Sequence, residues 1–263
     1  MSAKSSKLRP VVLSIAGYDP SSGAGVTADI KTIAAHGCYG ISCITALTVQ
    51  STRGVRRVVP VSGKAITATL DELVGDFVIS AVKIGMLGSA EAARAVARFL
   101  KCHRFKTVVL DPVLVSSSGT RLLAPEGVQV LKRELLKLAD VITPNAAEAA
   151  ALTGIRIDSS QDRERTAQKL HELGARNVIV TGGHLKIPND FLSMDSGARA
   201  KVLTGRKVST RSTHGTGCAF STALACNLAL GKGLARATAA AKKYVTDALK
   251  SARPIGKGIG PVV

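Results

Sequence analysis

The segment Val11–Thr32, VVLSIAGYDPSSGAGVTADIKT, contains an aliphatic run, a turn rich in glycine and serine, and a stretch with helical periodicity. Its first part, Val11–Ala16, has the continuous apolar composition of a strand that is buried on both faces. Residues 23–35 then predict an amphipathic helix. A buried strand that leads through a short turn into a helix is the repeating unit of α/β folds.

The same alternation of strand and helix continues along the chain. Further strands are predicted at residues 42–47, 55–59, 81–84, 107–110, 141–143 and 178–181, and helices near 63–75, 89–101, 125–138, 145–152 and 161–173. Strands at 191–194 and 201–203 are expected to form a hairpin around Ser196–Gly197, before helices at 217–230 and 233–252. This pattern predicts a mostly parallel sheet with helices on both faces. Because no linker interrupts it, we predict one domain, residues 11–263, after a short basic tail, residues 1–10.

The composition excludes several classes of protein. With 46% hydrophobic and 21% charged residues among 263, the chain can bury a large core and is not disordered. No apolar run approaches the roughly 20 residues of a membrane-spanning helix, so no membrane partner is expected. The net charge of +18 favours anionic ligands, but three Tyr, five Phe and no Trp are too few to stack bases, so we expect no specific nucleic-acid partner. Five cysteines without a CxxC pair predict free thiols in the cytoplasm.

The turns that follow strands are the candidate binding segments, because open α/β sheets bind ligands beyond the carboxyl ends of their strands. Neither GxxxxGK(S/T) nor a GxGxxG after the first strand is present, which argues against a P-loop or a dinucleotide-type site. In the first turn, glycines permit close approach of a ligand. Asp29 lies one to two helical turns further on, where its carboxylate can face either the strand ends or solvent.

A second glycine-rich segment, His214-Gly215-Thr216-Gly217-Cys218, leads into a strongly apolar helix. Backbone N–H groups at the positive end of a helix dipole predict an anion hole, although tight helix packing would also explain the glycines. Because the dipole lowers the pKa of a thiol in the first turn, Cys218 is predicted to be a reactive thiolate. The alternative is that Cys218 is a small buried hydrophobe.

A third segment, Thr143-Pro144-Asn145-Ala146-Ala147-Glu148, leaves a strand and enters a helix. Asn145 followed three residues later by Glu148 has the form of a capping box. The same Glu148 is placed to hold a hydrated Mg²⁺ beside phosphates. Both interpretations stay open at this point. The turns Asp111-Pro112-Val113 and Thr181-Gly182-Gly183-His184 are weaker signals of the same kind.

Taken together and in this order, these segments resemble the hydroxymethylpyrimidine/phosphomethylpyrimidine kinases of thiamine biosynthesis, a family of the ribokinase superfamily. That family opens close to IAGSDPSGGAGxxADxKT, and Ile15–Thr32 reads IAGYDPSSGAGVTADIKT. The other matches are Tyr39-Gly40, ITALTVQ at 44–50, KIGML at 83–87, Asp111–Val113, Thr143–Glu148 and HGTGC at 214–218. The sugar kinases of this superfamily carry Asp where this chain has Cys218. The resemblance implies a ribokinase-like three-layer sandwich.

The resemblance also implies an activity and a set of site residues. The activity is transfer of the γ-phosphoryl group of ATP, with Mg²⁺, to the hydroxymethyl group of an aminopyrimidine and then to the resulting monophosphate. The implied catalytic residues are Cys218, Gly215, Thr216 and Gly217, and the substrate-binding residues are Gly17, Asp29, Gln50, Met86 and Val113. The implied ATP-binding residues are Asn145, Thr181, Gly183, Gly215 and Gly217, and the metal ligands are Glu148 and Asp111. A homodimer is the expected assembly.

Two departures from the family pattern alter these expectations. Thr181 stands where the family usually has Lys before Gly-Gly-His, so a hydroxyl replaces a full positive charge near the phosphates. We therefore expect the first phosphorylation to be retained and the second to be slow. Tyr18 and Ser22 replace the usual Ser and Gly and are expected to narrow or reshape the substrate mouth. The competing interpretations are a pyridoxal-type kinase on the same scaffold and a catalytically silent, basic binding protein.

Overall fold

A computed structural model describes residues 9–183, 188–195 and 200–263, and its strands form one nine-stranded sheet. The strands are β1 (Val11–Tyr18), β2 (Tyr39–Ser51), β3 (Gly54–Pro60), β4 (Ile79–Ile84), β5 (Val108–Leu110), β6 (Val141–Ile142), β7 (Asn177–Val180), β8 (Asp190–Met194) and β9 (Lys201–Leu203). Their order is β3-β2-β1-β4-β5-β6-β7-β8-β9. Pairing is parallel from β2 through β7 and antiparallel at β3, β8 and β9. The predicted mostly parallel sheet is confirmed.

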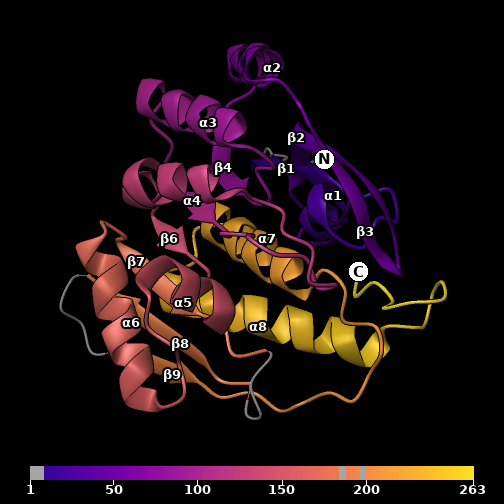
Figure 1. Ribbon diagram of the computed structural model, residues 1–263, viewed down its shortest axis with the longest axis vertical. Helices are drawn as coiled ribbons and strands as arrows, with labels where there is room; N and C mark the ends of the chain where they lie inside the picture. Colours follow the sequence, from indigo (N-terminus) through magenta and orange to yellow (C-terminus); the bar gives the residue numbers. More distant parts are fainter. Residues whose placement is uncertain (1–8, 184–187, 196–199) are drawn as a thin grey trace, which may run out of the picture.

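Helices cover both faces of this sheet (Figure 1). They are α1 (Gly25–Ala35), α2 (Gly63–Asp76), α3 (Ala90–Cys102), α4 (Pro125–Val130), α5 (Ala146–Thr153), α6 (Ser160–Glu172), α7 (Thr216–Ala229) and α8 (Leu234–Ser251). Buried residues of α2 to α6 share one core with the sheet, and those of α1, α7 and α8 share a second core. Two cores separated by one sheet are the three-layer sandwich that the sequence predicts.

One predicted helix is less regular than expected. Residues 125–138 are helical throughout, but the α-helix ends at Val130. It continues as a wider π-type turn, η1 (Leu131–Leu135), and closes with a tighter 3-10 turn, η2 (Leu136–Leu138). Leu131, Leu135 and Leu136 are all buried in the core, so the irregular stretch still anchors the helix layer.

The strand order places the candidate site. β1 lies inside the sheet, with β2 and β3 on one side and β4 to β9 on the other. The chain first adds β2 and β3 on one side of β1 and then crosses over to add β4 to β9 on the other side. The border between β1 and β4 is therefore a topological switch point, and ligands of open α/β sheets bind in the crevice at such a point. Helix α7 packs against β1, β4 and β5 at this crevice.

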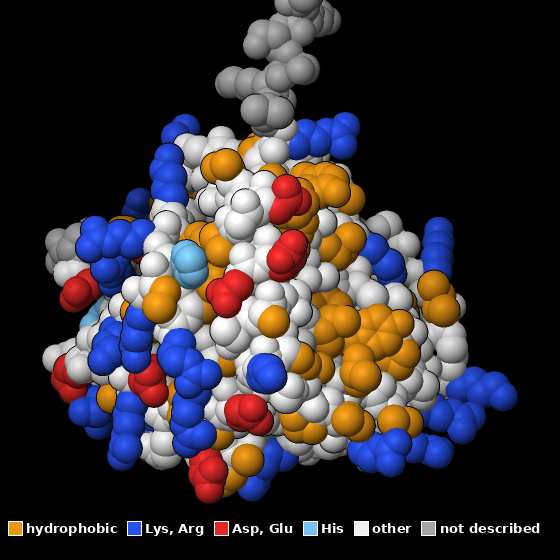
Figure 2. Space-filling model, turned by 90° about the horizontal axis from the view of Figure 1, so that it is seen from above, with side chains coloured by type: hydrophobic (Ala, Val, Ile, Leu, Met, Phe, Trp, Pro, Cys, Tyr) orange, Lys and Arg blue, Asp and Glu red, His pale blue; other side chains and the backbone are white. Residues whose placement is uncertain are grey.

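Some expectations fall outside the described residues, namely most of the basic tail with Lys4 and Lys7, and the hairpin turn at Ser196–Gly197. Among the described residues, no helix is long and apolar enough to cross a membrane. Figure 2, viewed from the α2 side, shows Lys and Arg side chains mainly along the flanks of this face. An apolar area lies between them.

Candidate active site

Two loops meet beyond the end of β1. The loop after β1 approaches the start of α7 so closely that a Cβ atom at Gly215 would lie 1.8 Å from the carbonyl oxygen of Gly23. A Cβ atom at Gly25 would lie 2.1 Å from the carbonyl oxygen of Gly17. Gly215 (φ +83°) and Gly25 (φ +60°) also adopt the left-handed backbone conformation that glycine tolerates best. Glycine at position 215 therefore permits the contact between the two loops, and glycine at position 25 permits the first loop to fold back on the end of β1.

The segment Gly215–Cys218 forms the start of α7. No side chain caps this helix. Within the described residues, the N–H groups of Gly217 and Cys218 donate to no protein acceptor. Unpaired N–H groups at the positive end of a helix dipole favour an anion. The geometry suits the predicted anion hole, with Gly215 and Thr216 at its entrance, and an anion at this place stays a prediction.

Cys218 lies in this first helical turn, where its surroundings act against a thiolate. Burial raises the pKa of the thiol to about 12, against the opposing effect of Lys83, while Asp29 and Asp111 add to the rise. The predicted lowering of this pKa is wrong, because burial beside two carboxylates outweighs the dipole of one helix. Cys218 is therefore a neutral thiol at neutral pH.

Asp29 is fully buried, and its predicted contact with a pyrimidine is wrong in this structure. Its carboxylate accepts hydrogen bonds from Lys83 Nζ at 3.0 and 2.8 Å and from Ser14 Oγ at 2.6 Å. A further hydrogen bond comes from Thr222 Oγ1 at 2.7 Å. With 0% of its surface exposed, Asp29 has no face left for a ligand. Asp29 instead joins α1 to β4 and α7 beneath the site.

Lys83 on β4 is the partner of Asp29, and sequence analysis assigned it no role. Burial lowers the pKa of this ammonium group, but Asp29, Cys218 and Asp111 outweigh burial and raise the pKa above its usual value. A Cβ atom at position 85 would lie 2.9 Å from Lys83 Nζ, so Gly85 leaves space for the cation. The signal in the sequence was a lone Lys inside an apolar strand, since a buried Lys needs a buried partner.

Asp111 and Glu148 are the predicted metal ligands, and both are buried. Burial raises the pKa of Asp111, and burial together with the charge of Asp111 raises the pKa of Glu148 to about 8. A divalent cation between such carboxylates would let both ionise. Mg²⁺ usually takes one or two carboxylates together with water and phosphate oxygens. The pair fits that ion, although the described residues hold no cluster of three or more His, Cys, Asp or Glu.

Glu148 also completes the capping box at the start of α5. The Glu148 N–H donates to Asn145 Oδ1 and the Asn145 N–H donates to Glu148 Oε2, each at 2.9 Å. The structural interpretation of this pair is therefore confirmed. It does not exclude the metal, because a carboxylate oxygen has lone pairs for more than one partner.

Three of the predicted substrate residues form an apolar surface. A Cβ atom at Gly17 would lie 2.8 Å from Met86 Sδ, so only glycine leaves this face of Met86 open. Met86 is buried in a small cluster with Ala46 and Leu122, and Val113 packs against it. The structure thus brings Gly17, Met86 and Val113 together as the family resemblance implies, and a flat ring suits such a surface.

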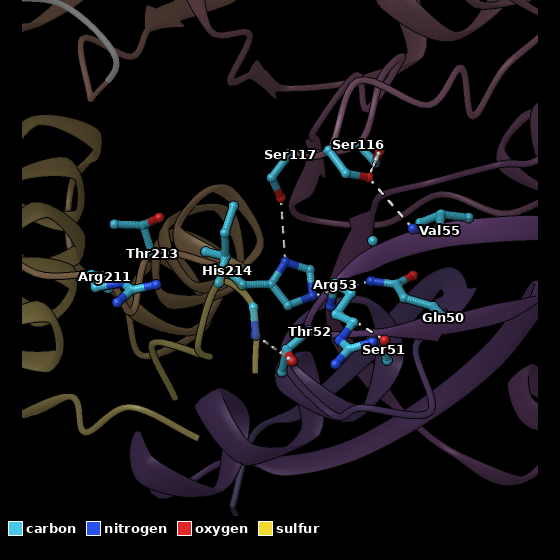
Figure 3. Close-up of a pocket in the computed structure, with 14 residues that line it drawn as sticks. Gln50, Ser51, Thr52, Arg53, Val55, Ser116, Ser117, Arg211, Thr213 and His214 are labelled. Atoms are coloured by element: carbon cyan, nitrogen blue, oxygen red, sulfur yellow. Dashed lines mark hydrogen bonds between the residues drawn. The ribbon is translucent and has the colours of Figure 1, made fainter. Parts of the chain in front are cut away.

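Gln50 faces a cavity of about 390 Å³ (Figure 3), whose lining does not include Gly17, Met86 or Val113. One end of its amide lies 3.1 Å from Thr48 Oγ1 and the other end lies 3.1 Å from His214 Nε2. An amide has two N–H donors and two oxygen lone pairs, so one donor and one acceptor remain for a ligand. This matches the donor and acceptor pattern of an aminopyrimidine.

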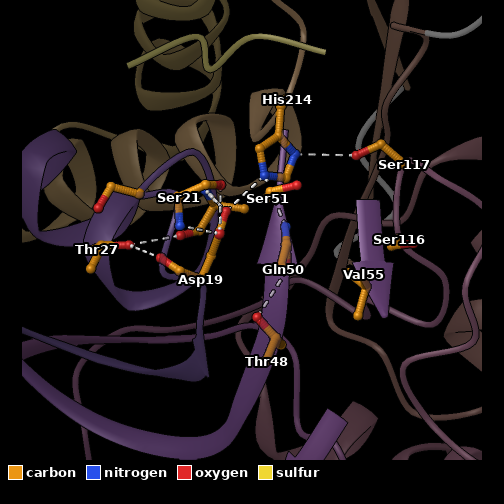
Figure 4. Close-up of polar contacts among 12 residues, drawn as sticks. Asp19, Ser21, Thr27, Thr48, Gln50, Ser51, Val55, Ser116, Ser117 and His214 are labelled. Atoms are coloured by element: carbon orange, nitrogen blue, oxygen red, sulfur yellow. Dashed lines mark hydrogen bonds and ion pairs between the residues drawn. The ribbon is translucent and has the colours of Figure 1, made fainter. Parts of the chain in front are cut away.

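His214 lies between the loop after β1 and the loop at residues 116–118, and the sequence did not predict its contacts with either loop. Its Nε2 lies 2.7 Å from Asp19 Oδ2, and its Nδ1 lies 3.3 Å from Ser117 Oγ (Figure 4). Burial opposes ionisation of Asp19, but hydrogen bonds from His214 and Ser21 outweigh it and lower the pKa of the carboxyl. An ionised Asp19 therefore accepts the Nε2 proton of His214 and orients the imidazole ring, and the Gln50 amide lies against this ring.

The predicted ATP-binding residues lie at the ends of β6 and β7. Asn145 and Thr181 are bridge partners, and the Thr181 N–H donates to the Pro144 carbonyl at 2.9 Å. Gly183 is exposed two residues further on, and His184 lies outside the described residues. The structure therefore brings Asn145, Thr181 and Gly183 to one edge of the crevice, where nucleotide binding stays a prediction.

Comparison with known proteins gives consistent results. The sequence profile of the phosphomethylpyrimidine kinase family matches residues 19–263. Hydroxymethylpyrimidine/phosphomethylpyrimidine kinase of Haemophilus influenzae is 44% identical over 254 residues, which cover 95% of this chain and 94% of that protein. A thiamine biosynthesis bifunctional protein of Geobacter sulfurreducens is 42% identical over 97% of this chain, which spans 52% of that longer protein.

A solved structure with the same fold belongs to a pyridoxal kinase. The crystal structure of an ADP complex of Bacillus subtilis pyridoxal kinase has a TM-score of 0.87 and 35% sequence identity, and covers 96% of each chain. The predicted ribokinase-like architecture is confirmed by this likeness. Fold alone does not choose the acceptor, because one scaffold supports several acceptors.

Proposed function

This chain belongs to the phosphomethylpyrimidine kinase family, and we propose on that basis that it uses ATP to phosphorylate hydroxymethylpyrimidine and then its monophosphate in thiamine biosynthesis. One observation carries the proposal: the segment His214–Cys218 contributes both the histidine that contacts Gln50 and the N–H groups of the anion hole. Acceptor recognition and phosphoryl stabilisation therefore share one segment. Membership of an enzyme family argues against the catalytically silent binding protein.

The residues divide the work of phosphoryl transfer among themselves. Such a transfer depends on in-line positioning and on neutralising charge, with little covalent chemistry for the protein. The N–H groups of Gly217 and Cys218 would stabilise charge on the transferred group. Mg²⁺ held by Asp111 and Glu148 would neutralise phosphate charge. Cys218, as a neutral thiol, positions the acceptor oxygen by hydrogen bonding.

The decisive assay supplies hydroxymethylpyrimidine with MgATP and separates monophosphate from diphosphate products by mass spectrometry. We expect the monophosphate to accumulate before the diphosphate appears. Pyridoxal, offered alone and in competition, is the comparison acceptor, because the pyridoxal kinase of Bacillus subtilis shares the fold. Phosphorylation of pyridoxal in preference to the pyrimidine would reassign the acceptor, and no phosphorylation of either would remove the proposed activity.

Gln50→Ala is expected to weaken pyrimidine binding. Losing a hydrogen-bond partner inside a site costs about 1–3 kcal/mol, so the dissociation constant should rise roughly 5- to 150-fold. The affinity for ATP should change little, since Gln50 and the Asn145–Thr181 edge lie on different strand ends. Calorimetry with each ligand measures both effects. The control is Gln168→Ala on the exposed side of α6, and a loss of ATP affinity without a loss of pyrimidine affinity would reverse the assignment.

Thr181→Lys is expected to speed the second phosphorylation more than the first. When the acceptor is itself a phosphate monoester, two anions approach each other, and a local cation stabilises that encounter. The distributed charge of +18 compensates only in part, because salt screens it over about 8–10 Å. Single-turnover rates of the two steps check this. Thr69→Lys, an equal charge change at an exposed position of α2, is the control, and equal acceleration of both steps would contradict the assignment.

The family resemblance and the β2–β3 ribbon also support a homodimer. Leu47 and Val59 are register partners on this ribbon, and they and Val49 are each more than 40% exposed, at 46%, 42% and 45%. Exposed aliphatic residues gathered on one face are typical of protein interfaces. Figure 2 shows an apolar area on the side of the molecule near α2. Sedimentation at the monomer mass would contradict this assembly.

The free cysteines agree with a reducing compartment, and we infer that the reaction takes place in the cytoplasm.

A further inference from the structure

The cavity beside Gln50 has a lining that suits an anion. It lies between the turn of β2 and β3, the loop at residues 116–118, the segment before α7 and the C-terminal segment. Its lining residues are Gln50, Ser51, Thr52, Arg53, Gly54, Val55, Ser116, Ser117, Ser118, Arg211, Thr213, His214, Gly258 and Ile259. This set contains two arginines, several hydroxyl groups and no carboxylate. Its ionic character is therefore entirely positive.

The charges of Arg53 and Arg211 are available to a ligand. Among the described residues, neither arginine lies within ion-pair distance of a carboxylate. Both line the cavity around His214 (Figure 3). Asp19, which contacts His214, already accepts three further hydrogen bonds from Ser21 and Ala24. Two unpaired guanidinium groups at one cavity offer the planar donor geometry that matches phosphate oxygens.

Backbone contacts hold the walls that carry these arginines. The Ile259 N–H donates to the Thr52 carbonyl at 2.8 Å, and the Gly258 N–H donates to Thr52 Oγ1 at 3.1 Å. The Gly260 N–H donates to the Arg211 carbonyl at 3.3 Å. The C-terminal segment therefore ties the Arg53 wall to the Arg211 wall. Such ties fix the backbone that carries both arginines before any ligand arrives, so binding has to order only their side chains.

We propose that this cavity is a phosphate subsite: Arg53 and Arg211 bind the phosphate group of the pyrimidine monophosphate, next to Gln50, which reads the ring. The inference rests on the proposed function and deepens it. A volume of about 390 Å³ has room for a ring with its phosphate, as ligand pockets span about 300–1,000 Å³. A neutral acceptor has nothing to offer the arginines, whereas a phosphate dianion pairs with both. The subsite thus provides local positive charge that Thr181 does not.

The test measures binding without ATP, by calorimetry, for three ligands: pyrimidine monophosphate, hydroxymethylpyrimidine and inorganic phosphate. In the Arg53→Ala/Arg211→Ala double variant, we expect the monophosphate to bind at least about tenfold more weakly, because two charge-assisted contacts are lost. Hydroxymethylpyrimidine should bind within about twofold of the wild type, since a neutral ligand makes no such contact. The control is Arg56→Ala/Arg57→Ala on the exposed strand β3, which removes the same charge from residues that do not line the cavity.

Each outcome decides the proposal. A loss confined to the monophosphate and to the cavity variant supports it. An equal loss in the control variant would assign the effect to the general positive field and overturn the subsite, as would unchanged affinity in the cavity variant. Inorganic phosphate that binds as tightly as the monophosphate would assign the arginines to free phosphate. If wild-type protein binds no pyrimidine and phosphorylates none, the proposed function itself fails, which the wild-type assay shows separately.

Discussion

Cys218→Ala is expected to lower kcat by at least about 10²-fold, the usual scale for a positioned acid–base or donor group. The thiol lies at the start of α7, close enough to Lys83, Asp29 and Asp111 for their charges to act on it. The affinity for ATP should change little, because backbone N–H groups of the anion hole persist in alanine. Steady-state kinetics with both acceptors measures the effect.

Two companion measurements separate the roles of this thiol. Because its pKa is raised to about 12, the thiolate fraction should grow about tenfold per pH unit through pH 10. Alkylation by iodoacetamide should rise accordingly, without a plateau near pH 8. Cys218→Ser keeps a neutral donor and should retain more turnover than Cys218→Ala if positioning is the role. Cys102→Ala, at an exposed cysteine, is the control, and turnover of Cys218→Ala at the wild-type level would remove Cys218 from the mechanism.

Local patterns in the sequence predict most of this fold. Continuous apolar runs identify buried strands, and the position of every strand is recovered within a few residues. The largest difference is β2, predicted at 42–47 and observed at Tyr39–Ser51. Its ends contain Gly, Ser and Gln, which carry no strand periodicity, and they are extended because the neighbouring strands β1 and β3 pair with them. Tertiary pairing thus lengthens a strand beyond its own propensity.

Part of the candidate site can also be predicted from local sequence patterns, and part depends on contacts between residues far apart in the sequence. The helix start at Gly215–Cys218 follows from small residues before a strongly apolar stretch, whereas the grouping of Gly17 with Met86 was implied only by the family resemblance. The wrong expectation for Asp29 arose because its partner Lys83 is 54 residues away in sequence. Asp19 and His214 are 195 residues apart. No local pattern shows which distant charge will meet a buried carboxylate, although a lone Lys within an apolar strand indicates that one must exist.

Lys83→Met is expected to lower the free energy of unfolding by about 3–5 kcal/mol, the cost of removing one partner from a buried ion pair. Lys83 and Asp29 are both fully buried, with Nζ to Oδ2 at 2.8 Å. After the substitution, the Asp29 carboxylate keeps only hydroxyl donors, Ser14 and Thr222, against its charge. Urea denaturation measures the loss. Lys101→Met is the control, since it breaks an exposed pair with Glu134, and such pairs contribute about 0–1 kcal/mol.

The double variant Lys83→Met/Asp29→Asn separates the charge from the packing. If the uncompensated carboxylate causes the loss, neutralising it should restore a large part of the stability, and the double variant should be more stable than Lys83→Met alone. The pH dependence has a definite sign as well. A Lys whose pKa is raised on folding contributes stability that is present below its unfolded pKa and lost only as pH rises through the folded value. The contribution of the Lys83 charge itself should therefore stay constant from about pH 6 to 9. A double variant less stable than Lys83→Met would show that the uncompensated Asp29 carboxylate is not the cause of the loss.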